Sequence, residues 1–149
     1  MEDLLVLEKR LTGDISMYDF ELINKAKEIG LKNFKCCMKD EIKGKPINNE
    51  TGIINLRTSK AKNGTHWTCY YYKNEKEKYY VDSYGLDPPL ELQKYLGHNI
   101  KVFCTYDGKY PDEPIQRFDT TICGQLCLIV LYLLQNGESF ENVIKILSQ

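Results

Sequence analysis

The sequence lacks the features that mark membrane, secreted and strongly nucleic-acid-binding proteins. Its longest apolar run, Leu126 to Leu134, is about half of what a membrane-spanning helix requires. The first ten residues begin with acids and offer no small-residue cleavage site, so no secretory signal peptide is predicted. Twenty Lys and Arg against 21 Asp and Glu give a net charge of −1, which excludes a strongly basic nucleic-acid binder. We therefore expect an intracellular protein that is not secreted and has no membrane association.

Histidine is scarce, and the six cysteines are not spaced as zinc ligands. A structural zinc site uses short Cys or His pairs such as C-x2-C, whereas the close pairs here are adjacent (Cys36 and Cys37) or four apart (Cys123 and Cys127). We therefore expect no metal. Without signs of secretion, we also expect reduced thiols, most of them small core residues and one or two chemically active.

The small net charge hides an uneven distribution. Residues 25–62 hold ten Lys or Arg and four Asp or Glu, a balance of +6, whereas residues 82–149 hold five and nine, a balance of −4. The basic segment is either a solvated surface or a face for a polyanion or an acidic partner. Because only this segment offers cations to phosphates, we expect nucleic-acid binding to be weak or absent.

The length of 149 residues and the hydrophobic fraction of 42% indicate one domain, 1–149. The pattern predicts an α+β fold: a central mixed β-sheet containing a β-hairpin, packed against one buried apolar helix. The expected helices cover 16–30, 88–97, 123–135 and the residues after 139; the expected strands cover 34–38, 52–56, 65–72, 78–84 and 99–106.

Two polar residues are expected to meet on the hairpin. A turn at about Asn74 and Glu75 would place residues whose numbers sum to roughly 148–149 opposite each other, which pairs His66 with Asp82. In such a pair a carboxylate fixes the tautomer and orientation of an imidazole base. Taken separately, a strand histidine is more often a packing or surface residue, and Asp82 could serve turn chemistry alone.

Cys123 opens the predicted buried helix. A thiol at a helix N-terminus lies at the positive end of the helix dipole, which lowers its pKa toward the thiolate, and the free N–H groups can hold an oxyanion. Gln116, in the preceding segment, could supply a second oxyanion donor. A cysteine at a helix start is also, and more often, a small core residue. Together these residues supply the parts of a Cys-His-Asp acyl-transfer site.

The motifs resemble the adenovirus-type (adenain-like) cysteine endopeptidases, whose clan also contains the ubiquitin-like-protein proteases. The resemblance rests on Gly-Thr-His66-Trp67, Asp82-Ser-Tyr-Gly, Gln116 and Ile-Cys123-Gly-Gln-Leu-Cys-Leu, and it covers about residues 52–134. It implies that Cys123 is the nucleophile, His66 the base, Asp82 its orienting acid and Gln116 the oxyanion donor.

The sequence departs from that family in two places. Asp82 stands where adenovirus enzymes usually have Glu, as in the ubiquitin-like-protein proteases, and Ile122 stands where those cellular proteases typically carry Asp. Cys104 resembles the cysteine through which adenovirus enzymes form a disulfide to an activating peptide, although it could equally be a packing residue of a strand. We expect no required cofactor, with an activating peptide as the alternative.

The resemblance implies a monomeric endopeptidase of an adenovirus-like double-stranded DNA virus or a related mobile element. Its substrates would be capsid precursors cleaved at glycine-containing sites, and it would act in the host cell, its nucleus or the virion. One alternative is a ubiquitin- or SUMO-specific protease of the same clan. The alternative from another class is a non-catalytic binding module that retains the fold.

Overall fold

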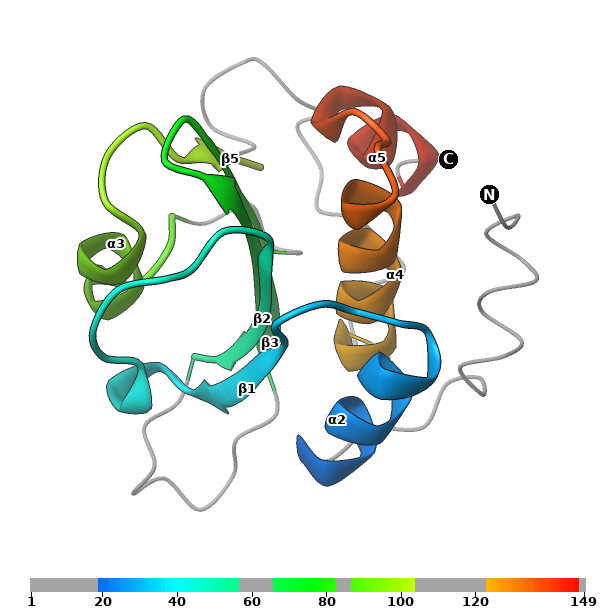
Figure 1. Cartoon of the computed structure of the whole chain (residues 1–149), viewed down its shortest axis with the longest axis horizontal. Coiled ribbons are helices and arrows are strands. Elements are labelled where there is room, and N and C mark those ends of the chain that lie inside the picture. Colours follow the sequence, from blue (N-terminus) through cyan, green and yellow to red (C-terminus); the bar gives the residue numbers. More distant parts are fainter. Residues whose placement is uncertain (1–18, 57–65, 83–86, 104–122, 148–149) are drawn as a thin grey trace.

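The computed structural model describes residues 19–56, 66–82, 87–103 and 123–147, which form a mixed sheet with helices on both faces (Figure 1). The elements are, in chain order, α2 (Asp19–Glu28), β1 (Lys35–Met38), the 3-10 helix η1 (Lys39–Glu41), β2 (Glu50–Asn55), β3 (Trp67–Asn74), β4 (Glu77–Val81), α3 (Leu90–Leu96), β5 (Lys101–Val102), α4 (Cys123–Gln135) and α5 (Phe140–Leu147). The expected α+β class is confirmed.

The five described strands lie in the order β1-β2-β3-β4-β5. The two inner pairings, β2 with β3 and β3 with β4, are antiparallel, while the outer strands β1 and β5 run parallel to their neighbours. The predicted mixed sheet is therefore correct, and the hairpin lies at its centre. Of the strand expected over 99–106, the structure describes Lys101–Val102 as β5.

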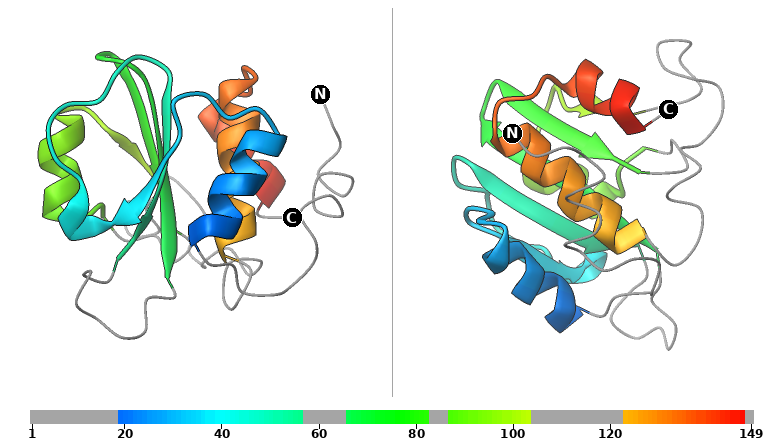
Figure 2. Two further views of the ribbon diagram at one scale, coloured as in Figure 1. Left: turned by 60° about the horizontal axis from the view of Figure 1, so that its bottom comes forward. Right: turned by 90° about the vertical axis from the view of Figure 1, so that its right-hand side faces the viewer.

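The sheet separates two cores. Helices α2, α4 and α5 cover one face, and α3 covers the other (Figures 1 and 2). Because successive strand residues point to opposite faces, Trp67, Cys69 and Tyr71 of β3 pack toward α4, whereas Tyr70 and Tyr72 pack toward α3. Within the described ranges, none of the helices combines the length and apolar character needed to cross a membrane.

The ends of the helices follow the expected capping residues. Gly30 (φ +79°) closes α2: its N–H donates to the Lys27 carbonyl, and the next N–H, of Leu31, donates to Ala26, as in a Schellman motif. Ser139 caps α5, with its hydroxyl accepting from the N–H of Asn142 at 3.1 Å. The predicted cap of α2 at Ser16 lies outside the described residues.

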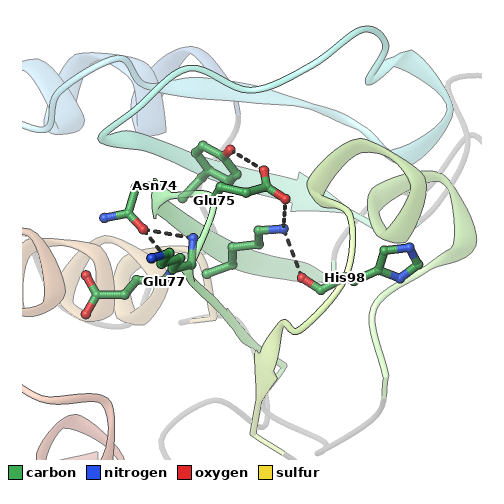
Figure 3. A network of polar contacts seen from close by, with 7 residues as sticks. Asn74, Glu75, Glu77 and His98 are labelled. Atoms are coloured by element: carbon green, nitrogen blue, oxygen red, sulfur yellow. Dashed lines mark hydrogen bonds and ion pairs between the residues drawn. The ribbon is translucent and has the colours of Figure 1, made fainter.

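The hairpin register differs from the prediction. From Cys69–Val81 to Tyr72–Lys78 the numbers of the paired residues sum to 150, and after a bulge Asn74 pairs with Glu77. The predicted sum of 148–149 is therefore wrong. The cause is the turn, which begins one residue later than expected. The side chain of Asn74 accepts from the N–H groups of Lys76 (2.9 Å) and Glu77 (3.0 Å) and thereby makes Asn74 the last strand residue (Figure 3).

A second set of polar contacts anchors the hairpin tip to the loop after α3 (Figure 3). The buried Lys78 ammonium donates to the Glu75 carboxylate (3.2 Å) and to the His98 carbonyl (2.9 Å), and the Tyr72 hydroxyl also donates to Glu75 (2.9 Å). The Tyr72 hydroxyl and then Lys78 lower the pKa of Glu75 below its ordinary value. This carboxylate therefore stabilises the fold at neutral pH, and its contribution is lost as the pH falls through the lowered pKa.

Gly52 of β2 is the position at which an added methyl group has no space. An ideal Cβ there would lie 2.1 Å from Cε1 of Tyr70, whose fully buried ring is held by a 2.6 Å hydrogen bond to Glu50. We expect Gly52→Ala to lower the free energy of unfolding by about 3 kcal/mol, as overpacked cores do, measured by chemical denaturation. In a Tyr70→Leu background the same substitution should cost clearly less; equal costs in both backgrounds would show that the ring is not the obstacle.

Candidate active site

The backbone of His66 continues the central sheet by one residue before β3 begins. Its carbonyl accepts a hydrogen bond from the N–H of Leu56 at 3.1 Å, which extends the pairing of β2 with β3 beyond Asn55–Trp67. The histidine therefore sits at the end of a central strand rather than on a loop. Because the backbone of His66 is held by the sheet, the point from which its imidazole side chain extends is fixed.

His66 and Asp82 are in contact, as the sequence predicted. Nε2 of His66 lies 2.7 Å from Oδ1 of Asp82, which directly follows β4. The observed register places Thr68, not His66, opposite position 82, so the two side chains are diagonal neighbours across the hairpin. The contact still forms because the imidazole and the carboxylate are together long enough to bridge the distance between diagonal positions of the two strands.

The burial of Asp82 and the partial exposure of His66 favour a role for His66 as a base. The Asp82 side chain is 0% exposed, whereas that of His66 is 20% exposed and so remains accessible at one edge. A carboxylate acceptor at Nε2 favours the tautomer with its proton on Nε2 and leaves Nδ1 free to act as a base. When Nδ1 takes up a proton, the positive imidazolium faces a buried negative charge, which stabilises that protonated state.

The residue after His66 points to the other face of the sheet and contacts α4. Trp67 is 4% exposed, and its ring lies against the first turn of α4: an ideal Cβ on Gly124 would be 3.3 Å from its Cδ1. One turn further along, the Cys127 thiol donates to the Trp67 carbonyl at 3.5 Å. The N-terminal turn of α4 therefore packs directly against the strand segment that begins beside His66.

Cys123 is the first residue of α4, immediately before Gly124. The first turn of this helix carries no acidic residue, so none of the helix's own carboxylates offsets the positive end of its dipole there. The first N–H groups of a helix have no partner within it and can donate to an anion. Position 123 therefore combines a thiol-bearing residue with an environment that favours negative charge.

Two predicted site residues, Gln116 and Cys104, lie outside the described residues, and of Cys123 the structure describes the backbone alone, as the first residue of α4. The four cysteines whose side chains the structure describes, Cys36, Cys37, Cys69 and Cys127, form no disulfide. Burial, and secondarily the charge of Glu41, raises the pKa of Cys37 to about 11, so this thiol is a poor nucleophile at neutral pH. Within the described part of the chain, no three His, Cys, Asp or Glu side chains cluster as metal ligands.

The sequence did not indicate that α2 reaches the same end of α4. Figure 2 shows α2 and α4 running side by side over the sheet, and a Cβ on Gly124 would lie 3.1 Å from Leu22 of α2. Leu22 is fully buried, as its helical spacing with Ala26 indicates, but periodicity identifies only the buried face of a helix and not its partner. Gly124 was the available signal, because a glycine early in a helix can mark a close approach.

Trp67, the single tryptophan of the chain, allows this packing to be tested by fluorescence. Because its ring is buried between β3 and α4, we expect an emission maximum clearly blue-shifted from that of free tryptophan and weak quenching by acrylamide. Unfolding in denaturant should shift the emission to the red. A native spectrum like that of a solvated indole would contradict the packing of α4 on β3.

Comparisons with known proteins identify the fold. No model of a protein family matches the sequence, and no curated protein matches it. Two crystal structures of the ASFV pS273R protease are similar: a selenomethionine form with a TM-score of 0.55 and 13% identity, and a second with a TM-score of 0.52 and 14% identity. Each match covers 93% of this chain and 67% of the protease chain. The chain therefore shares the fold of that protease.

Proposed function

We propose that this protein is a cysteine endopeptidase in which Cys123, His66 and Asp82 form the catalytic unit. The observation that carries the proposal is the 2.7 Å bond between His66 and the fully buried Asp82, at the end of the strand against which the first turn of α4 packs. The shared fold with a viral protease adds support, because that protein's name states the same class of activity.

The proposed reaction begins with proton transfer from the Cys123 thiol to Nδ1 of His66. The thiolate attacks the peptide carbonyl, and the oxyanion accepts hydrogen bonds from the N–H groups that begin α4 and from Gln116. Collapse of this intermediate breaks the C–N bond, and the imidazolium returns its proton to the leaving amine. His66 then deprotonates a water molecule, which hydrolyses the thioester and regenerates the thiol. Throughout these steps Asp82 keeps the imidazole oriented.

The substrates we propose are viral precursor proteins cleaved at glycine-containing sites. This part of the proposal rests on the resemblance of the motifs around His66, Asp82 and Cys123 to the adenovirus-type enzymes. The presence of Asp82 rather than Glu is the one observation that favours the second candidate, a ubiquitin- or SUMO-specific protease of the same clan. Both candidates use the same chemistry and differ only in the substrate.

Fluorogenic substrates separate these functions. The purified chain is mixed with a short diglycine peptide amide, or with ubiquitin or SUMO carrying a C-terminal fluorogenic group, and Cys123→Ser serves as the inactive control. Hydrolysis of the peptide at a rate comparable to or above that of the two proteins supports the viral-type enzyme. Turnover of ubiquitin or SUMO alone supports the second candidate. If the wild type hydrolyses none of the three, the result counts against the proposed protease and favours the binding module.

We further propose that the enzyme needs no cofactor, and that Cys104 is at most a site where an activating peptide attaches.

Adding duplex DNA at physiological salt should change the rate by less than about tenfold, because the affinity for phosphates grows with the number of cations offered. A steep stimulation that salt abolishes would show instead that the basic segment 25–62 binds nucleic acid.

A further inference from the structure

A buried hydrogen bond joins α4 to the strand that begins beside His66. The Cys127 thiol donates to the Trp67 carbonyl with a sulfur–oxygen distance of 3.5 Å, and both residues are buried. The thiol is thus one partner of this buried backbone acceptor.

The two ends of this bond are each close in the chain to a proposed catalytic residue. Cys127 follows Cys123 by four residues, which is about one helical turn, so both positions lie on the same side of α4. Trp67 is bonded directly to His66. The contact thus links the helical turn that carries the proposed nucleophile to the residue next to the proposed base.

Contacts at Gly124 also restrict how far the first turn of α4 can move. The Trp67 ring and Leu22 of α2 both approach the position where a Cβ would stand, at 3.3 and 3.1 Å. These van der Waals contacts hold the first turn of α4 against β3 and α2 but are non-directional. The thiol–carbonyl bond is directional, and therefore fixes how α4 is rotated and shifted along β3.

We propose that Cys127 is a positioning residue that sets the spacing between Cys123 and His66 through its bond to the Trp67 carbonyl. This inference rests on the proposed function. It assigns to the second cysteine of the helix a role in holding the nucleophile rather than in attacking the substrate. A thiolate paired with an imidazolium depends on their separation, so a displacement of α4 changes the pH at which the Cys123 thiolate forms.

The experiment measures the rate at which iodoacetamide alkylates Cys123 between pH 5 and 9. The thiolate sulfur forms a bond to the methylene carbon of the reagent and iodide leaves, and peptide mass spectrometry assigns the product to each cysteine. Three substitutions separate volume from hydrogen bonding: Cys127→Ala and Cys127→Val remove the donor, the first with a loss of side-chain volume and the second with a small gain, and Cys127→Ser keeps a donor. Cys69→Ala is the matched control, since Cys69 is equally buried in the same core and lies on β3.

We expect Cys127→Ala and Cys127→Val to move the alkylation profile of Cys123 to higher pH and to slow it roughly threefold to tenfold at pH 6.5, the effect of losing one buried hydrogen bond. Cys127→Ser should restore most of the rate, and Cys69→Ala should leave the profile unchanged. Thermal unfolding shows that each variant is folded at the assay temperature. Because Val keeps the core filled, it carries the test if Ala is too unstable.

Two results would overturn the inference. An unchanged profile in Cys127→Val, or an equal shift in Cys69→Ala, would show that Cys127 only fills space, while leaving the proposed protease function intact. If Cys123 of the unaltered protein alkylates like an ordinary thiol, with a midpoint near about pH 8.5, the proposed function itself fails and the inference fails with it. The unaltered protein therefore distinguishes the two failures.

Discussion

Cys123→Ala is expected to reduce peptide hydrolysis by about 10³-fold or more, without unfolding the protein. The substitution removes the proposed nucleophile, without which the proposed thioester does not form. His66→Ala should cause a loss of similar size, because residues that act as one catalytic unit lose activity together. Initial rates on the preferred substrate of the fluorogenic panel measure both effects, and circular dichroism with thermal unfolding establishes that the fold persists.

Cys36→Ala is the matched control for the loss of a thiol. Cys36 is a half-buried free cysteine on the edge strand β1, away from the end of β3 at which His66 lies. Its replacement should leave the rate within about twofold of the wild type, as is usual for substitutions outside a site. Near-normal turnover by Cys123→Ala would show that another residue is the nucleophile.

Asp82→Asn is expected to lower kcat/KM by about 10- to 100-fold, less than the loss of Cys123 does. The amide can still accept a hydrogen bond from Nε2 of His66, but it removes the negative charge that stabilises the imidazolium. The proton on His66 should then dissociate at a lower pH. The alkaline limb of the rate profile should therefore move to lower pH, a shift that a purely structural defect would not produce.

Asp87→Asn controls for the loss of a carboxylate near the same strand. Asp87 is exposed and lies five residues after Asp82. Its substitution should change neither the rate nor the pH profile. Wild-type rates in Asp82→Asn across the whole pH range would remove Asp82 from the catalytic unit and leave its buried bond to His66 as a structural feature.

Local patterns predicted the elements of this fold well. The helix over Cys123–Gln135 matches the prediction at both ends, because a continuous apolar run bounded by polar residues leaves little choice of limits. The two hairpin strands were also predicted, with ends that differ from the observed ones by one to three residues, since aromatic and β-branched residues flank a short polar segment. The 3-10 helix η1 was not predicted, because three polar residues carry no periodicity.

The meeting of His66 and Asp82 was predicted from a register that proved to be wrong by about two residues. An approximate turn position is enough to bring two strand ends together, but the pairing itself depended on the side chain of Asn74 and the bulge after Tyr72. The contact survives this error because diagonal neighbours on a sheet are still within reach of long side chains.

The packing around α4 could not be predicted from local patterns. The approach of Trp67 and Leu22 to Gly124 joins residues from three separate elements, and it depends on how those elements dock. Helical periodicity identifies Leu22 as buried but does not identify its partner. The same limit applies to the Cys127 bond, since a cysteine in an apolar helix reads only as a small core residue.

The most direct test of the central claim is the relative reactivity of the six cysteines toward iodoacetamide at pH 7, resolved by peptide mass spectrometry. The account predicts that Cys123 reacts at least about tenfold faster than any other cysteine and that His66→Ala removes this advantage, because the imidazole accepts the thiol proton. Cys37, with a pKa raised to about 11, should react slowly although it is only half-buried. If Cys123 reacts no faster than Cys36, or if its rate is unaffected by His66→Ala, then no activated nucleophile exists at the start of α4 and the proposed function is wrong.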